Sequence, residues 1–154
     1  MGRYITIKPH IYNMYNEFEK IIIPIDGSKF AKKAAKKGFS IAKKFDIEVV
    51  IICVLDPFRY STSHEFFHSY TKIRREKAEE YINEIVKIGE SIGVKYKTRL
   101  IDGGTPLEEI IKSANKNDLI ILGSKGHSNL EKSLIGSVSE KVVRHANCSV
   151  LIVR

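Results

Sequence analysis

The chain has 154 residues, which is the size of one ordinary domain and enough to enclose a sizeable hydrophobic core. Its 43% apolar and 29% charged residues are typical of an ordered, soluble globular protein, and charges interrupt the apolar runs before they could form a transmembrane helix. The net charge of +8 favours polyanionic partners, and Cys53 and Cys148, in separate apolar segments, predict buried free thiols in a reducing, cytoplasmic compartment.

Residues 1–19 precede the first regular pattern and form an extension of their own. Arg3, Lys8 and His10 interrupt it, so we expect no secretory signal there. Its aromatic and β-branched residues make it too apolar for a simple disordered tail. We therefore expect it to pack on the domain formed by residues 20–154 or on a partner subunit.

From residue 20 onward, predicted strands and helices alternate, which is typical of a parallel sheet covered on both faces. Apolar stripes at helical spacing predict helices over residues 28–44 and about 63–91. Apolar and basic residues alternate over residues 94–101, which predicts an edge strand. Continuous runs of Ile, Val and Leu predict buried strands at residues 20–25, 48–55, 118–122 and 149–153.

Two patterns of the capping-box type predict where the last two helices begin. Thr105-Pro106-Leu107-Glu108 combines the box with proline at the first helical position, and Ser137-Val138-Ser139-Glu140 repeats the box. The Ser137 hydroxyl would cap its helix in one interpretation and contact a ligand in the other. The two roles could alternate with ligand occupancy.

A glycine-rich loop connects the predicted strand at residues 118–122 to the last helix. It begins with Gly123-Ser124-Lys125-Gly126, continues through nine residues and ends with Gly136-Ser137. Glycines let the backbone approach an anion closely, and the N–H groups of the loop and of the helix N-terminus would face the oxygens of that anion. The loop therefore predicts a phosphate site, although neither the P-loop pattern nor the dinucleotide fingerprint occurs in the chain.

The pattern Gly-x2-Gly-x9-Gly-Ser resembles the ATP-binding branch of the universal stress protein family. The likeness is strongest from Ile121 through the loop and on to Val153, and Gly104-Thr105-Pro106 adds weaker support. It covers residues 20–154 and is silent on the first nineteen. The resemblance implies a flavodoxin-like or Rossmann-like α/β domain, with an open parallel sheet of five strands in the order 3-2-1-4-5 and helices on both faces.

The resemblance also implies which residues would contact an adenine nucleotide. The base and ribose would lie at the carboxyl ends of the first two strands, against Pro24, Ile25, Asp26 and Val54. The phosphates would lie on the loop and the start of the last helix, against Gly123, Ser124, Lys125, Gly126, His127, Ser128, Asn129, Gly136, Ser137, Val138 and Ser139. Asp26 also precedes Ser28, so a role in capping the first helix stays open. His127 departs from the family pattern, and it could bond a phosphate, act in proton transfer or simply face solvent.

ATP is the ligand that the resemblance implies, with Mg²⁺ or Mn²⁺ held mainly through the phosphates and Asp26 nearby. Lys125 is the only cation in the segment 123–126, and no carboxylate that would position a water is identifiable. We therefore expect at most slow or partner-dependent hydrolysis. The resemblance further implies a regulator of stress responses or signalling with an unidentified partner. It would be a homodimer joined through the apolar edge strand at residues 149–153.

Two other functional classes stay open. The net charge and the seven lysines of the predicted first helix would suit a nucleic acid or another polyanion, although no reading motif accompanies them. His64-Glu65-Phe66-Phe67-His68 matches His-Glu-x-x-His, the zinc-binding pattern of metallopeptidases. This motif lies at the start of a predicted helix and has no evident third ligand, so a zinc-dependent hydrolase is the least favoured class.

Overall fold

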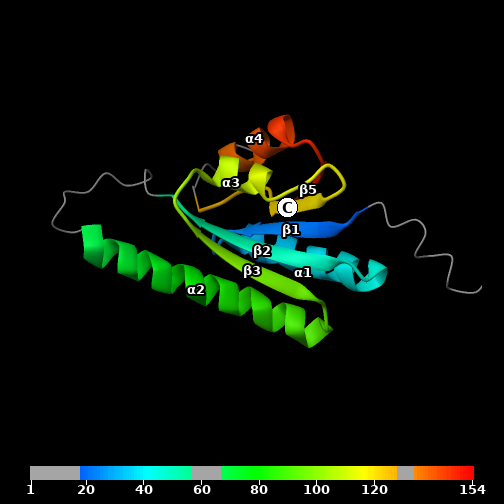
Figure 1. The fold of residues 1–154 in the computed structure, drawn as a ribbon, viewed down its shortest axis with the longest axis horizontal. Coiled ribbons are helices and arrows are strands. Elements are labelled where there is room, and N and C mark those ends of the chain that lie inside the picture. Colours follow the sequence, from blue (N-terminus) through cyan, green and yellow to red (C-terminus); the bar gives the residue numbers. More distant parts are fainter. Residues whose placement is uncertain (1–17, 57–66, 128–133) are drawn as a thin grey trace, which may run out of the picture.

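The computed structural model describes residues 18–56, 67–127 and 134–154, apart from the side chains of residues 67–70 (Figure 1). Nine elements follow one another along these parts of the chain: β1 (Lys20–Ile25), α1 (Lys29–Phe45), β2 (Glu48–Leu55), α2 (Phe67–Ile92), β3 (Tyr96–Asp102), α3 (Pro106–Lys112), β4 (Leu119–Gly123), α4 (Ser137–His145) and β5 (Ser149–Val153). No helix in the described parts is long and apolar enough to cross a membrane.

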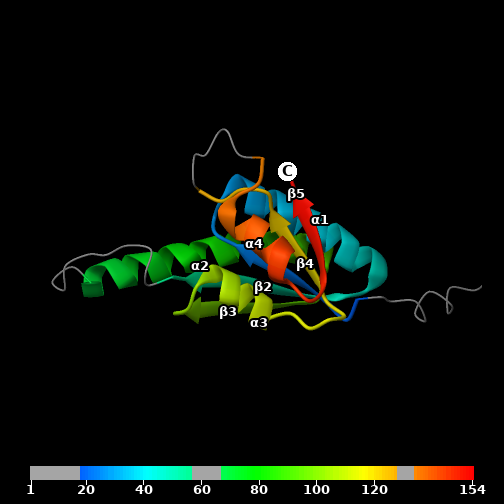
Figure 2. The ribbon, with the colours of Figure 1, turned by 90° about the horizontal axis from the view of Figure 1, so that it is seen from above.

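The five strands form one parallel sheet in the order β3-β2-β1-β4-β5. This is the predicted flavodoxin-like order, and it places β3 and β5 at the two edges. Helices α1 and α2 cover one face of the sheet, and α3 and α4 cover the other (Figures 1 and 2). The carboxyl ends of all five strands therefore meet at the same edge of the sheet.

The central strands are continuous apolar runs because both of their faces are buried. On β1, Ile21, Ile23 and Ile25 pack with α1 and α2, whereas Ile22 points to the other core beneath α3 and α4. On β2, Val49 and Val50 divide between the two cores in the same way. Successive side chains of a strand point to opposite faces of the sheet, so one sheet contributes to two hydrophobic cores.

Local signals set most helix boundaries within a residue or two of the prediction. The Ser28 hydroxyl accepts a hydrogen bond from Ala31 N at 3.1 Å and caps α1. The predicted capping box of α3 is confirmed, with both reciprocal bonds between Thr105 and Glu108 and with proline at the start. Of the long helix expected over residues 63–91, residues 67–92 are helical, and residues 63–66 lie outside the described residues.

The edge strand β3 begins at Tyr96, two residues later than predicted. Val94 N donates to the carbonyl of Gly89 at 3.2 Å, so Val94 still belongs to the turn that closes α2. Both cysteines are free thiols, as predicted. Cys53 is buried in β2, but Cys148 is only half-buried because it precedes the edge strand β5.

Candidate functional site

A cavity of about 130 Å³ opens at the carboxyl edge of the sheet, where β1, β2 and β4 end and α3 and α4 begin. Its position agrees with the general rule that ligands of open parallel sheets bind beyond the strand ends where the strand order reverses. The lining consists of Pro24, Ile25, Asp26, Ala31, Ile52, Val54, Pro106, Ile110, Leu122, Gly123, Lys125, Gly126, Gly136, Ser137, Val138 and Ser139.

The turn after β1 brings a carboxylate to this cavity. Asp26 Oδ1 accepts a hydrogen bond from Ser28 N at 2.9 Å. Its carboxylate therefore supports the turn that begins α1, as the capping interpretation proposed, and Asp26 also lines the cavity, as the ligand interpretation proposed. The two roles are compatible because Oδ1 faces the turn while Oδ2 lies against Gly126.

The loop after β4 has its carbonyl groups turned into the protein. Gly123 O accepts from Ser139 Oγ at 2.8 Å. Ser124 O accepts from Gly136 N at 2.6 Å, and Lys125 O accepts from Ser28 Oγ at 3.4 Å. In a trans peptide the N–H points opposite to the preceding carbonyl, so the N–H groups of Lys125 and Gly126 face away from these internal bonds. Because both residues line the cavity, the loop is suited to an anion.

Two glycines of the loop are required by close contacts rather than by unusual dihedral angles. A Cβ atom added at Gly123 would lie 2.6 Å from the backbone carbon of Phe30 in α1. A Cβ atom added at Gly126 would lie 2.6 Å from Asp26 Oδ2. The loop therefore passes directly over the β1–α1 turn, with no room for a side chain between them.

The predicted capping box at Ser137 is wrong. The N-cap of α4 is Gly136, in an extended conformation, and a glycine has no side chain with which to cap the first turn. The reason is a tertiary contact, because the bond from Gly136 N to Ser124 O fixes the extended residue one position earlier than the sequence pattern suggests. Ser137 is the first helical residue, and within the described parts of the chain no side chain caps the N-terminus of α4 at the cavity.

Other residues expected to contact phosphate lie less directly on the cavity. Ser124 is 1% exposed and stands behind the lining, with its N–H bonded to Val153 O at 2.7 Å. His127 is also outside the lining, and its Nε2 lies 2.7 Å from Asp26 O. Ser139 lines the cavity, but its hydroxyl proton is already donated to Gly123 O. Ser128 and Asn129 lie outside the described residues.

The sequence interpretation missed the apolar side of the cavity, formed by Ala31, Ile52, Pro106, Ile110 and Leu122. In the sequence these residues are indistinguishable from ordinary core residues. A usable signal existed for Pro106. It follows the strand at residues 94–101, and the predicted strand order places the end of that strand at the same sheet edge as Asp26 and Val54.

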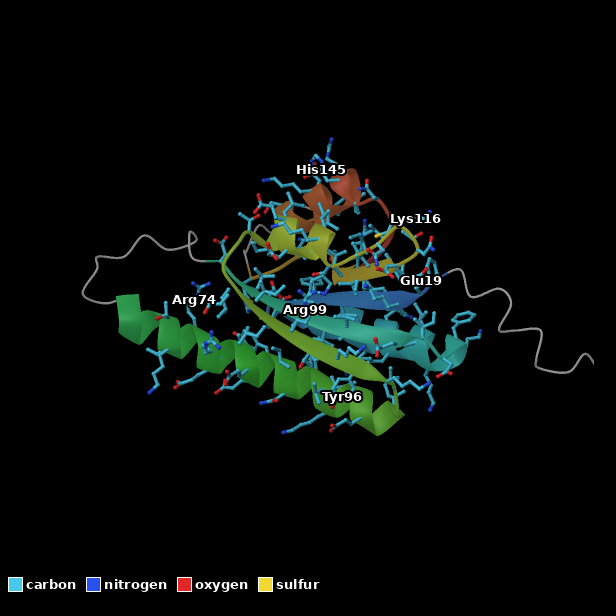
Figure 3. All side chains as sticks on the ribbon, viewed as in Figure 1. Glu19, Arg74, Tyr96, Arg99, Lys116 and His145 are labelled. Atoms are coloured by element: carbon cyan, nitrogen blue, oxygen red, sulfur yellow. The ribbon has the colours of Figure 1, made fainter. Side chains whose placement is uncertain are left out.

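Cys53 lies in β2 near this site, but its thiol is unreactive. Burial raises the pKa of the Cys53 thiol to about 11, and the Asp26 carboxylate adds to the rise, whereas Arg74 on α2 opposes it (Figure 3). A thiol with so high a pKa stays protonated at neutral pH. It is therefore a poor nucleophile and a poor metal ligand.

The described parts of the chain contain no group of three or more His, Cys, Asp or Glu side chains that could hold a metal ion. The His-Glu-x-x-His motif falls largely outside this description. His64 and Glu65 are not described, and His68 lies in α2 without a described side chain.

The sequence model of the universal stress protein family matches residues 17–154. This chain belongs to the universal stress protein family. Universal stress protein MJ0531 of Methanocaldococcus jannaschii is 37% identical over 156 residues, covering 99% of this chain and 91% of the relative. The alignment therefore runs through nearly all of residues 1–19, about which the resemblance implied nothing.

Solved structures agree with the family and with the fold. The structure of hypothetical protein MJ0577, solved as a structure-based assignment of its biochemical function, is 34% identical with a TM-score of 0.74, covering 89% of this universal stress protein and 96% of that chain. A universal stress protein from Archaeoglobus fulgidus in complex with dAMP has a TM-score of 0.66 at 20% identity, covering 89% of this chain and 98% of that one. The second likeness concerns the fold alone.

Proposed function

We propose that this universal stress protein binds ATP or a related adenine nucleotide in the cavity at the carboxyl edge of the sheet. One observation carries the proposal. A single cavity is bounded on one side by apolar residues and on the other by a loop with inward-turned carbonyls and by the N-terminus of α4, whose N-cap is a glycine. The Archaeoglobus fulgidus protein, which shares this fold, was solved in complex with dAMP, and the proposal extends that ligand class to this chain.

The two sides of the cavity suit the two ends of such a ligand. Pro24, Ile52 and Val54, with Pro106 and Ile110 opposite, would hold the base by apolar contact. The N–H groups of the loop and of α4 would receive the phosphates, and Lys125 adds a positive charge. Asp26 would lie near the ribose.

Chemistry at the phosphates would be slow or would depend on a partner. Fast phosphoryl transfer requires several charges and a positioned water around the transferred group, and the cation that the lining offers is Lys125. Mg²⁺ or Mn²⁺ would be held mainly by phosphate oxygens, with Asp26 as the acidic side chain among the described lining residues. In this proposal the protein is a cytoplasmic regulator of stress responses or signalling, and nucleotide occupancy carries the signal to an unidentified partner.

The site can be tested with two substitutions at one position. Aspartate and asparagine are both favourable N-cap residues, and in Gly136→Asp and Gly136→Asn the new Cβ atom would make the same close contact, 3.3 Å from Lys125 Cα. Only the aspartate places a negative charge where the phosphates would lie. We expect ATP or ADP at near one per chain to be released on denaturation of the parent protein and identified by mass spectrometry. We expect the nucleotide to be lost from Gly136→Asp and retained better by Gly136→Asn.

Equal loss in the two variants would mean that the added side chain blocks the site by its bulk. If the parent protein releases no nucleotide and added ATP produces no heat in calorimetry, the cavity is not a nucleotide site and the proposal fails.

The edge strand β5 supports the homodimer as part of the same proposal. Its residues Val150, Leu151, Ile152 and Val153 are only half-buried, and nothing in the described parts of the chain pairs with its outer edge. Antiparallel pairing of two β5 edges about a two-fold axis would cover both copies.

Helix α1 supports a second candidate function, binding of a nucleic acid or another polyanion. The helix contains seven lysines and no acidic residue. Lys29 and Lys33 lie over the ring of Phe30, and Lys44 lies over the ring of Phe45. All three lysines are exposed. The test is a gel shift of duplex DNA or RNA at several salt concentrations. This candidate would be favoured if the parent gives a salt-sensitive shift that the double variant Lys36→Glu, Lys37→Glu abolishes. The control double variant on α2, Lys77→Glu, Lys87→Glu, should retain the shift.

A further inference from the structure

His127 makes a contact that the phosphate interpretation did not foresee. Its Nε2 lies 2.7 Å from the main-chain oxygen of Asp26, about a hundred residues away in sequence. A carbonyl oxygen can only accept a hydrogen bond, so Nε2 must carry the hydrogen and donate it. The ring is thereby directed toward the β1–α1 turn, and His127 is not part of the cavity lining.

A second bond joins the same two segments in the opposite direction. The Ser28 hydroxyl accepts from Ala31 N, which leaves its own hydrogen to be donated to Lys125 O at 3.4 Å. Between these two bonds, Asp26 Oδ2 occupies the space where Gly126 would carry a Cβ atom. We call this arrangement of Asp26, Ser28, Lys125 and His127 the clasp.

Helix α2 supports the clasp from outside. Gly27 has a φ of +82°, a conformation that favours glycine, and the ring of Tyr81 occupies the place where a Cβ atom of Gly27 would stand. The same ring lies 6.2 Å from the His127 ring, centroid to centroid, with an interplanar angle of 33°. The position of His127 is therefore restricted by α2 as well as by the turn.

We propose that His127 is a positioning residue for the nucleotide site. Through the clasp it holds Lys125 and Gly126 with their N–H groups directed to the phosphates, and it does not touch the phosphates itself. The inference rests on the proposed function and deepens it, because it assigns phosphate affinity to a bond made outside the cavity. The binding affinity for phosphate-bearing ligands depends on the bond, whereas the affinity for the unphosphorylated nucleoside does not.

The test compares His127→Leu, which removes the donor, with His127→Gln, whose amide nitrogen can donate to the same carbonyl. His145→Leu is the matched control, since His145 lies at the C-terminal end of α4 (Figure 3). ATP affinity is measured by calorimetry and adenosine affinity by displacement. We expect His127→Leu to weaken ATP about tenfold, the scale of one lost hydrogen bond, and to leave adenosine within about twofold. His127→Gln should recover most of the loss, and His145→Leu should match the parent.

Several results would overturn the inference. Equal loss of ATP in His127→Leu and His127→Gln would mean that the ring itself, not the donated bond, is needed. Equal loss of ATP and adenosine would indicate general damage to the site. An unchanged ATP affinity in His127→Leu would remove His127 from the site while leaving the proposed function intact, whereas a parent protein that binds no ATP would defeat both.

Amide hydrogen exchange without ligand provides a second readout. If the clasp orders the loop, exchange at Ser124 and Gly136, whose N–H groups are bonded to Val153 O and Ser124 O, is faster in His127→Leu than in the parent and returns toward the parent rate in His127→Gln. The His145→Leu control should leave these amides unchanged. Identical exchange in all four proteins would show that the loop is ordered without His127, and the inference would fail.

Discussion

The hydroxyl group of Ser139, buried in the first turn of α4, donates a hydrogen bond of 2.8 Å to the carbonyl oxygen of Gly123 at the end of β4. Ser139→Ala would leave that buried carbonyl without its partner. We expect the free energy of unfolding to fall by about 1–3 kcal/mol in urea denaturation. Ser137→Ala is the matched control and should cost less than about 0.5 kcal/mol, because the N-cap of α4 is Gly136 and not Ser137. A cost at Ser137 as large as at Ser139 would contradict the assignment of the cap to Gly136.

Gly126→Ala should weaken ATP binding about tenfold or more, because the new Cβ atom would fall 2.6 Å from Asp26 Oδ2 and displace the loop. The clash should shrink when the carboxylate is absent. In an Asp26→Ala background, Gly126→Ala should therefore cost distinctly less, and calorimetry of the four proteins measures the coupling. Strictly additive losses would indicate that Gly126 is needed for a reason unrelated to Asp26.

The raised pKa of Cys53 predicts a loss of stability in alkali. Between pH 9 and 11 the unfolded chain releases the thiol proton while the folded protein, with a Cys53 pKa of about 11, retains it. The folded state then binds more protons, so the free energy of unfolding falls as the pH rises. Denaturation at several pH values should show a shallower fall for Cys53→Ala than for the parent. Equal slopes, or rapid alkylation of native Cys53 at pH 8, would contradict the buried, protonated thiol.

Leu151→Lys in β5 should convert the proposed dimer to monomer, because a charge would enter the apolar edge that two copies share. Light scattering measures the mass, and circular dichroism checks that the monomer remains folded. Thr98→Lys places the same charge on β3, the opposite edge of the sheet, and should leave the dimer intact. An unchanged dimer in folded Leu151→Lys would exclude β5 as the interface.

The fold was predictable because its signals are local and repeated. Apolar runs set the buried strands, the alternation of apolar and basic residues identified β3 as an edge, and the box at Thr105 fixed the start of α3. The order of the strands came from the family resemblance rather than from the residues. Where a boundary depends on a distant contact, local reasoning failed, as at Gly136, whose N–H is held by Ser124 O.

The lining of the candidate cavity was predictable only in part, for the same reason. Glycine spacing identified the loop, but not which groups turn inward. The hydroxyl of Ser139 and the ring of His127 both form hydrogen bonds with backbone carbonyl groups of neighbouring segments. Apolar wall residues such as Ile52 and Ile110 carry no chemical signature, since a side chain that lines a cavity and one that fills a core are the same in sequence.

A glycine as the N-cap of α4, with no side-chain cap among the described residues, has a thermodynamic consequence. A helix whose first turn lacks its cap is incomplete, and an anion bound at Gly136 would finish it from outside the chain. Binding of the ligand would add to the stability of the folded state, so the rigidity of α4 would increase with the concentration of the ligand. Because the strand end below α4 is bonded to β5 through Ser124 N and Val153 O, that stiffening would be transmitted to the edge where the proposed second subunit would attach.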